Sequence, residues 1–350
     1  MVNHPIKLGI VGIGRAGWGM HCKELAGRED KFNIAAACDV IPERCQKMAD
    51  HYGCKTYNAL EELIADPDVE VVDIATRSID HYEHARLALE AGKTVFLEKP
   101  ICRTYEEAVK LREVEKTTNG VLYFRHNRRF EKAFCHIREI ITSGILGEIF
   151  EIKLRRGSYQ RREDWQTLKK FGGGQLLNWG PHIIDQGLRL LEAEPESMWS
   201  DLKRIAAVGD AEDYFKILLR GQNNRVVDME MSGGRTVQEA EFMISGDRGG
   251  LWVDKSGISM KYLDPEQRLE ERAALSDTPP ETGSFGSSEN LNWIEETVEV
   301  NPSSSDNPES VWDYLYESVR HNKSFPITWD EVLAVMKVVS DAKQGTDFAE

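Results

Sequence analysis

A glycine-rich segment near the start of the chain constrains the fold more than any other feature. An apolar run at residues 6–11, typical of a buried strand, is followed at once by Gly12-Ile13-Gly14-Arg15-Ala16-Gly17 and a helical pattern over 15–27. In a G-x-G-x-x-G segment that joins a strand to a helix, the first glycine permits a tight turn. The second lets a pyrophosphate approach the backbone, and the third lets the helix pack on the strand. We therefore expect Gly12, Ile13, Gly14, Arg15 and Ala16 to contact a dinucleotide, with a purely structural glycine turn as the alternative.

Buried-strand patterns recur at regular intervals after this loop. They lie at residues 33–38, 69–75 and 94–97, and helical patterns at 42–52, 59–65 and 80–91 fall between them. Strands that alternate with helices at this interval form right-handed βαβ units and a parallel sheet. The first part of the chain is therefore predicted to be a doubly wound α/β domain.

Beyond residue 125 the pattern changes to alternating apolar and polar side chains. Phe150, Ile152 and Leu154 are predicted to share one face of a strand, and residues 225–231 and 241–253 have similar patterns. Such alternation indicates an antiparallel sheet with one solvated or covered face. A chain of 350 residues, at ~150 residues for an average domain, suggests two domains, which we place at 1–125 and 126–350. The polar segment 276–287 predicts an exposed loop.

A carboxylate stands where a dinucleotide-binding domain selects its cofactor. Asp39 ends the second strand pattern, 22 residues after Gly17. A carboxylate at this point can accept hydrogen bonds from the ribose hydroxyls and would repel a 2′-phosphate. NAD is therefore predicted over NADP. Arg44, five residues further on, could answer a phosphate, but we expect it on a solvated helix face.

Net charge narrows the class of partner. The chain carries 59 acidic and 44 basic residues, for a net charge of −15, and its basic residues form only short clusters. Nucleic acids need a concentrated basic surface, and no apolar run approaches the ~18 residues of a membrane span, so a small-molecule partner is expected. The six cysteines form no C-x-x-C pair or zinc spacing, and no export segment precedes the first strand. Reduced thiols, no metal site and a cytoplasmic location are the expectation.

Two further segments carry groups suited to hydride-transfer chemistry. Glu98-Lys99-Pro100 follows a predicted parallel strand, at the edge where open α/β sheets bind ligands, and a lysine there can stabilise an alkoxide. Residues 172–185 begin with three glycines and place Asn178 and His182 four apart on one face of a helical start. The His182 imidazole could remove a hydroxyl proton. A surface lysine and a packed histidine are the alternatives.

Taken together, these segments resemble the Gfo/Idh/MocA oxidoreductases, which include glucose–fructose oxidoreductase and inositol 2-dehydrogenase, over essentially the whole chain. The resemblance implies a Rossmann domain followed by an α/β domain with a large, mostly antiparallel open sheet. It also implies a cis Lys99-Pro100 bond and a homo-oligomer formed through the open face of that sheet. It rests on the glycine loop, Asp39, Ala75-Thr76-Arg77-Ser78 with His81, Glu98-Lys99-Pro100, Asn127-Arg128-Arg129-Phe130, Gly172–Asp185 and Ile244–Leu251.

The resemblance also implies roles for individual residues. Lys99 would orient the substrate and stabilise alkoxide, and His182 would be the acid/base. Glu98 would meet the nicotinamide ribose. The strand-end group of Thr76, Arg77, Ser78 and His81 would lie at the cofactor, with Thr76 and Ser78 at its ribose–phosphate region. The chain departs from the family pattern twice, with Asn178 where Asp is usual and with Arg77 where Pro is usual.

In the family, the segment that corresponds to residues 155–169 forms a wall of the substrate pocket. Here Tyr159 and Trp165 could stack on a sugar ring, and Arg162, Asp164 or Lys169 could bind hydroxyls or an acidic group. Asn178 could bind a substrate hydroxyl and hold the His182 ring. Surface or packing roles are the alternative for each of the 155–169 side chains.

The leading hypothesis is an NAD-dependent dehydrogenase or reductase that acts on a secondary hydroxyl of a sugar, polyol or glycoside. The first alternative is a lyase or glycoside-cleaving enzyme that retains NAD and works through a transient 3-keto intermediate. The second is a non-enzymatic NAD-dependent regulator, against which the presence of both Lys99 and His182 argues.

Overall fold

The computed structural model describes residues 4–274 and 289–349, and its first sheet is fully parallel. The predicted loop at 276–287 lies outside the described residues. The strand order is β3-β2-β1-β4-β5-β6, so the chain runs outward from β1 in both directions, as in a Rossmann domain. The strands are β1 Ile6–Val11, β2 Phe32–Cys38, β3 Lys55–Tyr57, β4 Val71–Ile74, β5 Thr94–Leu97 and β6 Val121–Phe124.

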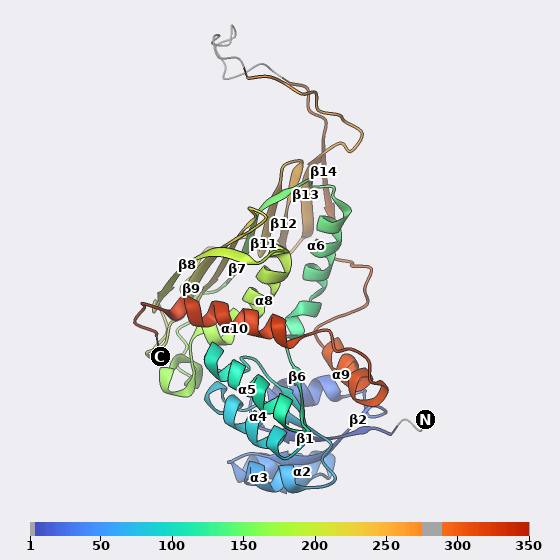
Figure 1. Cartoon of the computed structure of the whole chain (residues 1–350), viewed down its shortest axis with the longest axis vertical. Helices are drawn as coiled ribbons and strands as arrows, with labels where there is room; N and C mark the ends of the chain where they lie inside the picture. The colour runs from blue at the N-terminus through green and yellow to red at the C-terminus, as the bar shows by residue number, and fades with distance from the viewer. Residues whose placement is uncertain (1–3, 275–288, 350) are drawn as a thin grey trace.

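Helices cover both faces of this sheet (Figure 1). The predicted helix over 15–27 is shorter than expected, because a five-residue π-turn, η1 (Gly17–His21), leads into a four-residue α1 (Cys22–Leu25). The Ala16 carbonyl accepts from both Met20 and His21, which widens this turn, and Ala26 is already extended. The other helices are α2 Pro42–Tyr52, α3 Leu60–Ala65, η2 Ser78–Asp80, α4 His81–Glu90 and α5 Tyr105–Thr117.

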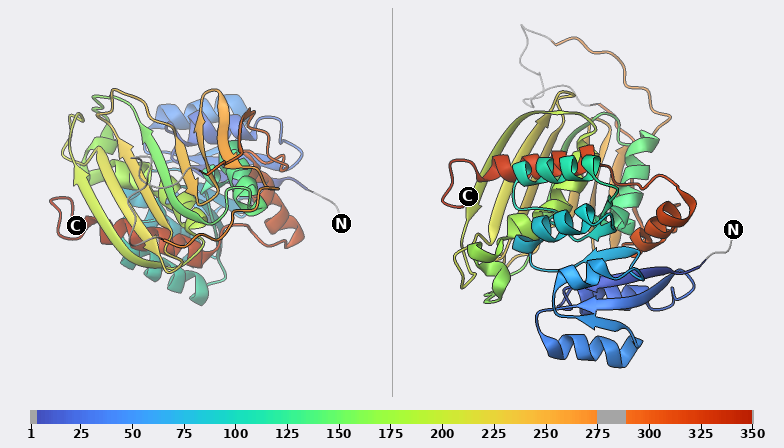
Figure 2. Two further views of the ribbon diagram at one scale, coloured as in Figure 1. Left: turned by 90° about the horizontal axis from the view of Figure 1, so that it is seen from above. Right: turned by 60° about the horizontal axis from the view of Figure 1, so that its bottom comes forward.

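The second sheet confirms the predicted mostly antiparallel architecture. Its order is β14-β13-β12-β11-β7-β10-β9-β8, and only β7 and β10 pair in parallel. Figure 2 shows helices on one face of this sheet, with the other face bare. The strands are β7 Ile149–Gly157, β8 Pro195–Lys203, β9 Tyr214–Gly221, β10 Val226–Ser232, β11 Phe242–Gly246, β12 Gly249–Asp254, β13 Gly257–Leu263 and β14 Trp293–Val298.

One detail of β7 differs from the prediction. Ile152 and Leu154 are buried, but Phe150 is exposed. Opposite β11, Glu151 pairs with Ser245 and Ile149 pairs with Gly246, so Phe150 is the extra residue of a bulge. A bulge changes the alternation of side chains along a strand, which the apolar pattern alone does not reveal.

Two helices near the end of the chain connect the halves of the molecule. Helix α9 (Ser310–His321) buries Trp312 against Phe32 and Phe96 of the first sheet. Helix α10 (Trp329–Lys343) packs on α5 and on α8 (Gly180–Leu191), which covers β10. The predicted division of the chain at residue 125 stays a prediction, since α9 lies far beyond it and packs on the first sheet. Helix α6 (Lys132–Ser143) completes the helical layer.

A buried carboxyl group anchors the short helix α7 (Gln175–Asn178), which leads into α8. Glu212 Oε1 accepts from the Leu176 N–H at 3.0 Å, and the Glu212 carbonyl accepts from Gln175 N at 3.0 Å. Gly174 has φ +111°, and a Cβ there would lie 2.1 Å from Glu212 Oε1, so this approach requires glycine. Burial raises the pKa of Glu212 to about 7, although the charge of Lys343 and the Leu176 hydrogen bond oppose the shift.

This raised pKa predicts how stability depends on pH. Ionising Glu212 costs free energy in the folded state only. The free energy of unfolding should therefore decrease as the pH rises from the unfolded pKa, near 4.5, to the folded pKa of about 7. The Glu212→Gln variant should be more stable than wild type at pH 8, by up to about 3 kcal/mol, and lose most of this advantage at pH 4.5. Chemical unfolding at both pH values measures this. Glu196→Gln, at an exposed position of β8, is the control. A change in stability that is equal at both pH values would contradict the prediction.

Candidate active site

The glycine loop has the shape that a pyrophosphate requires. Gly12 has φ +89°, and a Cβ there would lie 2.7 Å from the Ala75 carbonyl oxygen, while a Cβ on Gly17 would lie 2.1 Å from the Gly12 carbonyl oxygen. A Cβ on Gly14 would meet only the Arg44 guanidinium, at 3.9 Å. Gly12 and Gly17 are therefore required by the packing of the protein itself, whereas Gly14 leaves room for a ligand to approach the backbone. These residues fit a dinucleotide, and Ile13, Arg15 and Ala16 complete the loop.

Asp39 lies beside this loop, and its carboxylate already has protein partners. Its Oδ2 accepts from the Ile13 N–H at 2.7 Å and its Oδ1 accepts from the Ile41 N–H at 2.9 Å. Arg44 lies on an exposed face of α2, as expected, and its Nη1 also lies 3.2 Å from Asp39 Oδ2. Asp39 therefore shapes the loop, and a cation lies beside the carboxylate at the predicted ribose site.

The next predicted cofactor residues follow β4, where Ser78 is buried and Thr76 is half-buried. The Arg77 guanidinium lies over the Phe171 ring at 4.5 Å, which links this strand end to the second half of the chain. His81 is buried, with Nδ1 2.6 Å from the Pro100 carbonyl and Nε2 3.3 Å from the Thr76 carbonyl. Both ring nitrogens thus face protein carbonyls at the two strand ends, and the contact of His81 with the cofactor stays a prediction.

Glu98 is turned into the protein and belongs to a buried cluster of charges. Its Oε1 lies 2.6 Å from Arg125 Nη1 and 3.0 Å from His21 Nε2, and its Oε2 accepts from the Lys99 N–H at 2.9 Å. His21 Nδ1 lies 2.7 Å from Asp73 Oδ2. Burial alone would lower the pKa of His21, but the carboxylates of Asp73 and Glu98 outweigh it and raise the pKa to about 9. Burial likewise opposes ionisation of Glu98, yet Arg125 and His21 hold its pKa well below the usual range.

Lys99 brings the two halves of the predicted site together. Its Nζ donates to the Asn178 carbonyl at 2.7 Å and to Asn178 Oδ1 at 3.2 Å. The Lys99-Pro100 bond is cis, as predicted. Burial lowers the pKa of Lys99 to about 8. The positive charges of Arg15 and Arg128 act in the same direction, and the negative charge of Glu98 opposes them. The ammonium is therefore the main form at neutral pH, about one pH unit below its pKa.

His182 is a buried, neutral imidazole on α8. Burial, followed by the positive charges of Lys99 and Arg128, holds its pKa well below the usual range. Within the described residues its Nδ1 has no hydrogen-bond partner, although the atom is buried. A buried ring nitrogen without a partner costs free energy, so this atom is suited to a group that a ligand supplies. Because Lys99 binds Asn178, which lies one helical turn before His182, Lys99 and His182 belong to the same part of the site.

The predicted substrate wall is only partly available to a ligand. Tyr159 is 57% exposed and Trp165 is half-buried, so both rings can still be reached. Arg162 donates from Nε and Nη2 to the two oxygens of Asp164, each at 2.9 Å, so these two residues pair with each other. The Lys169 Nζ donates to the Asp347 carbonyl, and its contact with substrate stays a prediction.

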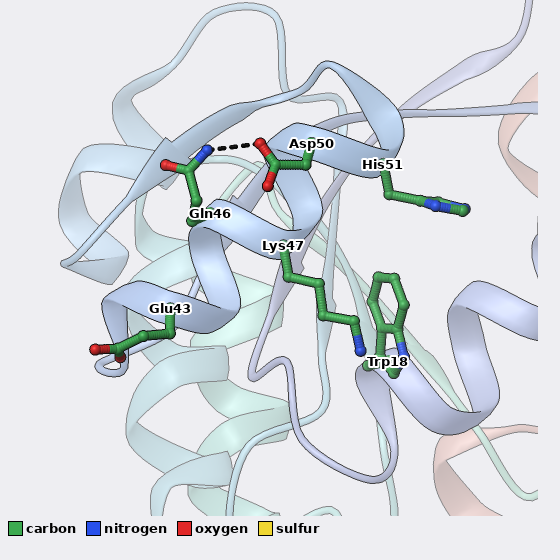
Figure 3. Close-up of a pocket in the computed structure, with 6 residues that line it drawn as sticks. All are labelled: Trp18, Glu43, Gln46, Lys47, Asp50 and His51. Carbon is green, nitrogen blue, oxygen red and sulfur yellow. Dashed lines mark hydrogen bonds between the residues drawn. The ribbon is translucent and has the colours of Figure 1, made fainter.

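One groove of the described surface lies away from the predicted site residues. It has a volume of about 460 Å³ and lies on the outer side of the first domain, between η1 and α2. Figure 3 shows Lys47 pointing at the Trp18 ring, with Nζ 3.7 Å from the ring centre. This groove contains none of the predicted site residues; it is lined by Trp18, Glu43, Gln46, Lys47, Asp50 and His51.

Three residues of the site were missed by sequence reasoning. His21 and Arg125 hold Glu98, and Gln166 donates to Asn178 Oδ1 at 3.4 Å. His21 is four residues after Gly17 and Arg125 directly follows a strand, but neither position has a chemical signal of its own. Their importance comes from pairing across strands, which only the fold creates.

Three general features of the described residues bear on the kind of site that they can form. No helix in ranges 4–274 and 289–349 is both long enough and apolar enough to cross a membrane. Over the same ranges, no three His, Cys, Asp or Glu side chains converge in a way that could hold a metal ion. All six cysteines are unpaired.

Known proteins resemble this chain in sequence and in fold. A scyllo-inositol 2-dehydrogenase (NADP(+)) of Bacillus subtilis is 26% identical over 97% of this chain and 94% of its own length. A D-glucoside 3-dehydrogenase of Escherichia coli is 29% identical over 55% of each chain. The crystal structure of an NAD-binding protein from Listeria innocua superposes with a TM-score of 0.81, at 25% identity, over 97% of this chain and 96% of that one.

Family comparison covers both halves of the chain. Residues 6–126 match the oxidoreductase family with an NAD-binding Rossmann fold, and residues 134–252 match the GFO/IDH/MocA C-terminal domain. The glycine loop, Asp39, Lys99 and the Asn178–His182 turn all lie within these two ranges. The chain belongs to the GFO/IDH/MocA family of oxidoreductases.

Proposed function

We propose that this oxidoreductase uses NAD to oxidise or reduce a secondary hydroxyl or keto group on a sugar, polyol or glycoside. One observation carries the proposal: the Lys99 ammonium is bound to Asn178, one helical turn before the neutral His182. A cation and a base thus meet at the edge of the sheet that also bears the dinucleotide loop. The names of two relatives, an inositol dehydrogenase and a glucoside dehydrogenase, support a polyhydroxylated substrate.

The residues of the site divide the work of such a reaction. A bound nicotinamide dinucleotide would supply the hydride acceptor or donor. The Lys99 ammonium can donate a hydrogen bond to the substrate oxygen and stabilise negative charge on it. His182, neutral because of its low pKa, can accept the hydroxyl proton during oxidation and return it during reduction. Trp165 and Tyr159 can stack on the ring of the substrate.

The amide of Asn178 keeps a second function open. The usual carboxylate at this position would stabilise an imidazolium at His182, which an amide cannot do. Enzymes that retain NAD and cleave a glycoside through a transient 3-keto intermediate need no net proton loss from the site. The test must therefore separate net oxidation from transient oxidation.

The experiment offers NAD and NADP with sugars, uronic acids, polyols and glycosides to the purified protein. Absorbance at 340 nm follows the cofactor, and mass spectrometry identifies the products. Stoichiometric NADH with a product two hydrogens lighter supports the dehydrogenase. A product formed without net NADH would overturn it in favour of the NAD-retaining enzyme.

Replacing either reacting side chain should abolish turnover. Lys99→Met and His182→Gln should each lower kcat by about 100-fold or more, because one loses the oxyanion donor and the other loses the base. Lys47→Met and His51→Gln, in the outer groove, are matched controls that should keep wild-type rates.

Wild-type kcat for oxidation should decline above about pH 8, as the Lys99 ammonium loses its proton. Steady-state kinetics over pH 5.5–10 measures this, and an alkaline limb that persists unchanged in Lys99→Arg would count against the role of Lys99.

Asp39 and Arg44 should set the choice of cofactor. NADH should bind about tenfold or more tightly than NADPH, because the Asp39 carboxylate repels a 2′-phosphate. Arg44→Ala should leave NADH affinity within about twofold and weaken NADPH further, since it removes the cation beside that carboxylate. Fluorescence titration of both reduced cofactors measures the affinities. Tighter binding of NADPH by wild type would contradict the choice of NAD.

We also propose that two or more copies associate through the bare face of the second sheet. Met243 of β11 pairs across the strands with Trp252 of β12, and both are exposed, as is Trp199 of β8. Exposed aromatic rings on a broad sheet favour burial against another protein surface.

We also propose that the protein acts in the cytoplasm, which the six unpaired cysteines support.

A charged residue in this face should break the assembly. Met243→Glu and Trp252→Glu should convert the oligomer to a monomer, because a carboxylate would be buried without a partner. Val109→Glu, on the exposed side of α5, is the matched control. Light scattering coupled to gel filtration measures the mass. A wild-type protein that is monomeric at about 50 μM, a concentration at which even a weak dimer should form, would overturn the proposal.

A further inference from the structure

The side-chain amide of Asn178 is held in one orientation from both ends. Its Oδ1 accepts from Lys99 Nζ at 3.2 Å and from Gln166 Nε2 at 3.4 Å. Its Nδ2 donates to Gln175 Oε1 at 3.4 Å. Lys99 can only donate, so the Asn178 atom that faces it must be the oxygen.

The orientation of Gln166 is fixed in turn by its own neighbour. Arg162 Nη2 donates to Gln166 Oε1, and a guanidinium has no acceptor to offer. Gln166 must therefore present its oxygen to Arg162 and its NH2 group to Asn178. Asp164 holds Arg162 through both carboxylate oxygens and also accepts from the Gln166 N–H at 3.0 Å. Hydrogen bonds of fixed donor and acceptor thus link Asp164 to Lys99: Arg162 donates on both sides, and Asn178 Oδ1 accepts on both sides.

These hydrogen bonds matter because the side chain at position 178 is an amide, which has one accepting end and one donating end. If the Asn178 amide turned over, its NH2 group would face the Lys99 ammonium, and two donors would oppose each other. A carboxylate at the same position would offer an acceptor in either orientation and would need no such control. The arrangement therefore compensates for a requirement that only asparagine creates.

We infer that Gln166 is a positioning residue, which, with Arg162 and Asp164 behind it, fixes the Asn178 amide so that its oxygen faces Lys99. This role rests on the proposed function only in assigning Lys99 to the reaction. It gives Arg162 and Asp164 a part in the site that differs from the predicted contact with substrate.

A double-mutant cycle tests the inference. Gln166→Met, nearly equal in volume, should lower kcat by about fivefold to tenfold with little change in KM, as expected for the loss of one hydrogen bond next to the reacting cation. In an Asn178→Asp background the same change should alter kcat by less than about twofold, since a carboxylate has no orientation to lose. Gln46→Met, at a glutamine of the outer groove, is the matched control and should leave kcat unchanged. Equal losses in the two backgrounds would show a purely structural role and overturn the inference.

A second measurement needs neither cofactor nor substrate. Trace acetylation of the folded protein by acetic anhydride, followed by peptide mass spectrometry, reports the fraction of Lys99 that is unprotonated at each pH. In wild type the midpoint should lie near pH 8. Gln166→Met should move it to lower pH, because Asn178 Oδ1 no longer stabilises the ammonium reliably.

In the Asn178→Asp background, Gln166→Met should leave the acetylation midpoint where Asn178→Asp puts it. A midpoint unmoved by Gln166→Met in the Asn178 background, or one moved equally in both backgrounds, would overturn the inference. Midpoints that move as expected in a protein that turns over no substrate would sustain the inference and count against the proposed function. If Gln166→Met does not fold, Gln166→Leu is the second variant, with thermal unfolding as the check on folding.

Discussion

The buried charges beneath the end of β5 are the constraint on which the rest of the site depends. Asp73, His21, Glu98, Arg125 and Glu24 form an unbroken series of ion pairs, and Trp312 Nε1 of α9 donates to Glu24 Oε2 at 2.7 Å. Charges removed from water must be paired, because loss of one partner leaves another uncompensated. The series therefore ties the turn after the glycine loop, three parallel strands and the C-terminal part of the chain into one arrangement.

Its consequence for function lies one residue away from the cluster. Glu98 fixes the Lys99 N–H, and Lys99 reaches across to Asn178 in the other half of the molecule. On the Asn178 side of this contact, amide groups take the place of ion pairs: Gln166 and Gln175 set the orientation of the Asn178 side chain. The first half thus determines where the ammonium lies, and the second half determines what it meets. His182, with a buried nitrogen that the described protein does not satisfy, lies on the second side of that contact.

The sequence predicts features that are local and repetitive, and misses those created by contact between distant segments. Strand and helix periodicity predicted the parallel sheet, and motif spacing brought the glycine loop, Asp39, Lys99 and His182 forward as site residues. Phe150 was placed on the wrong face because a bulge leaves no mark in an apolar pattern. Arg162 and Asp164 were expected to bind ligand, but Asp164 also caps the turn at Trp165–Thr167, which holds it beside Arg162. The buried carboxyl of Glu212 gave no signal, since its role depends on Gly174 approaching it from 38 residues away.

We propose that hydride passes between the nicotinamide and a substrate carbon held beside Lys99 and His182, and a crystal structure of the protein with NADH tests this proposal most directly. We predict a pyrophosphate on the Gly12–Gly17 loop, an adenosine ribose beside Asp39, and a nicotinamide ring at the strand end that carries Lys99, facing His182. A dinucleotide whose nicotinamide lies away from Lys99 and His182, or one seated instead in the outer groove at Trp18, would contradict it.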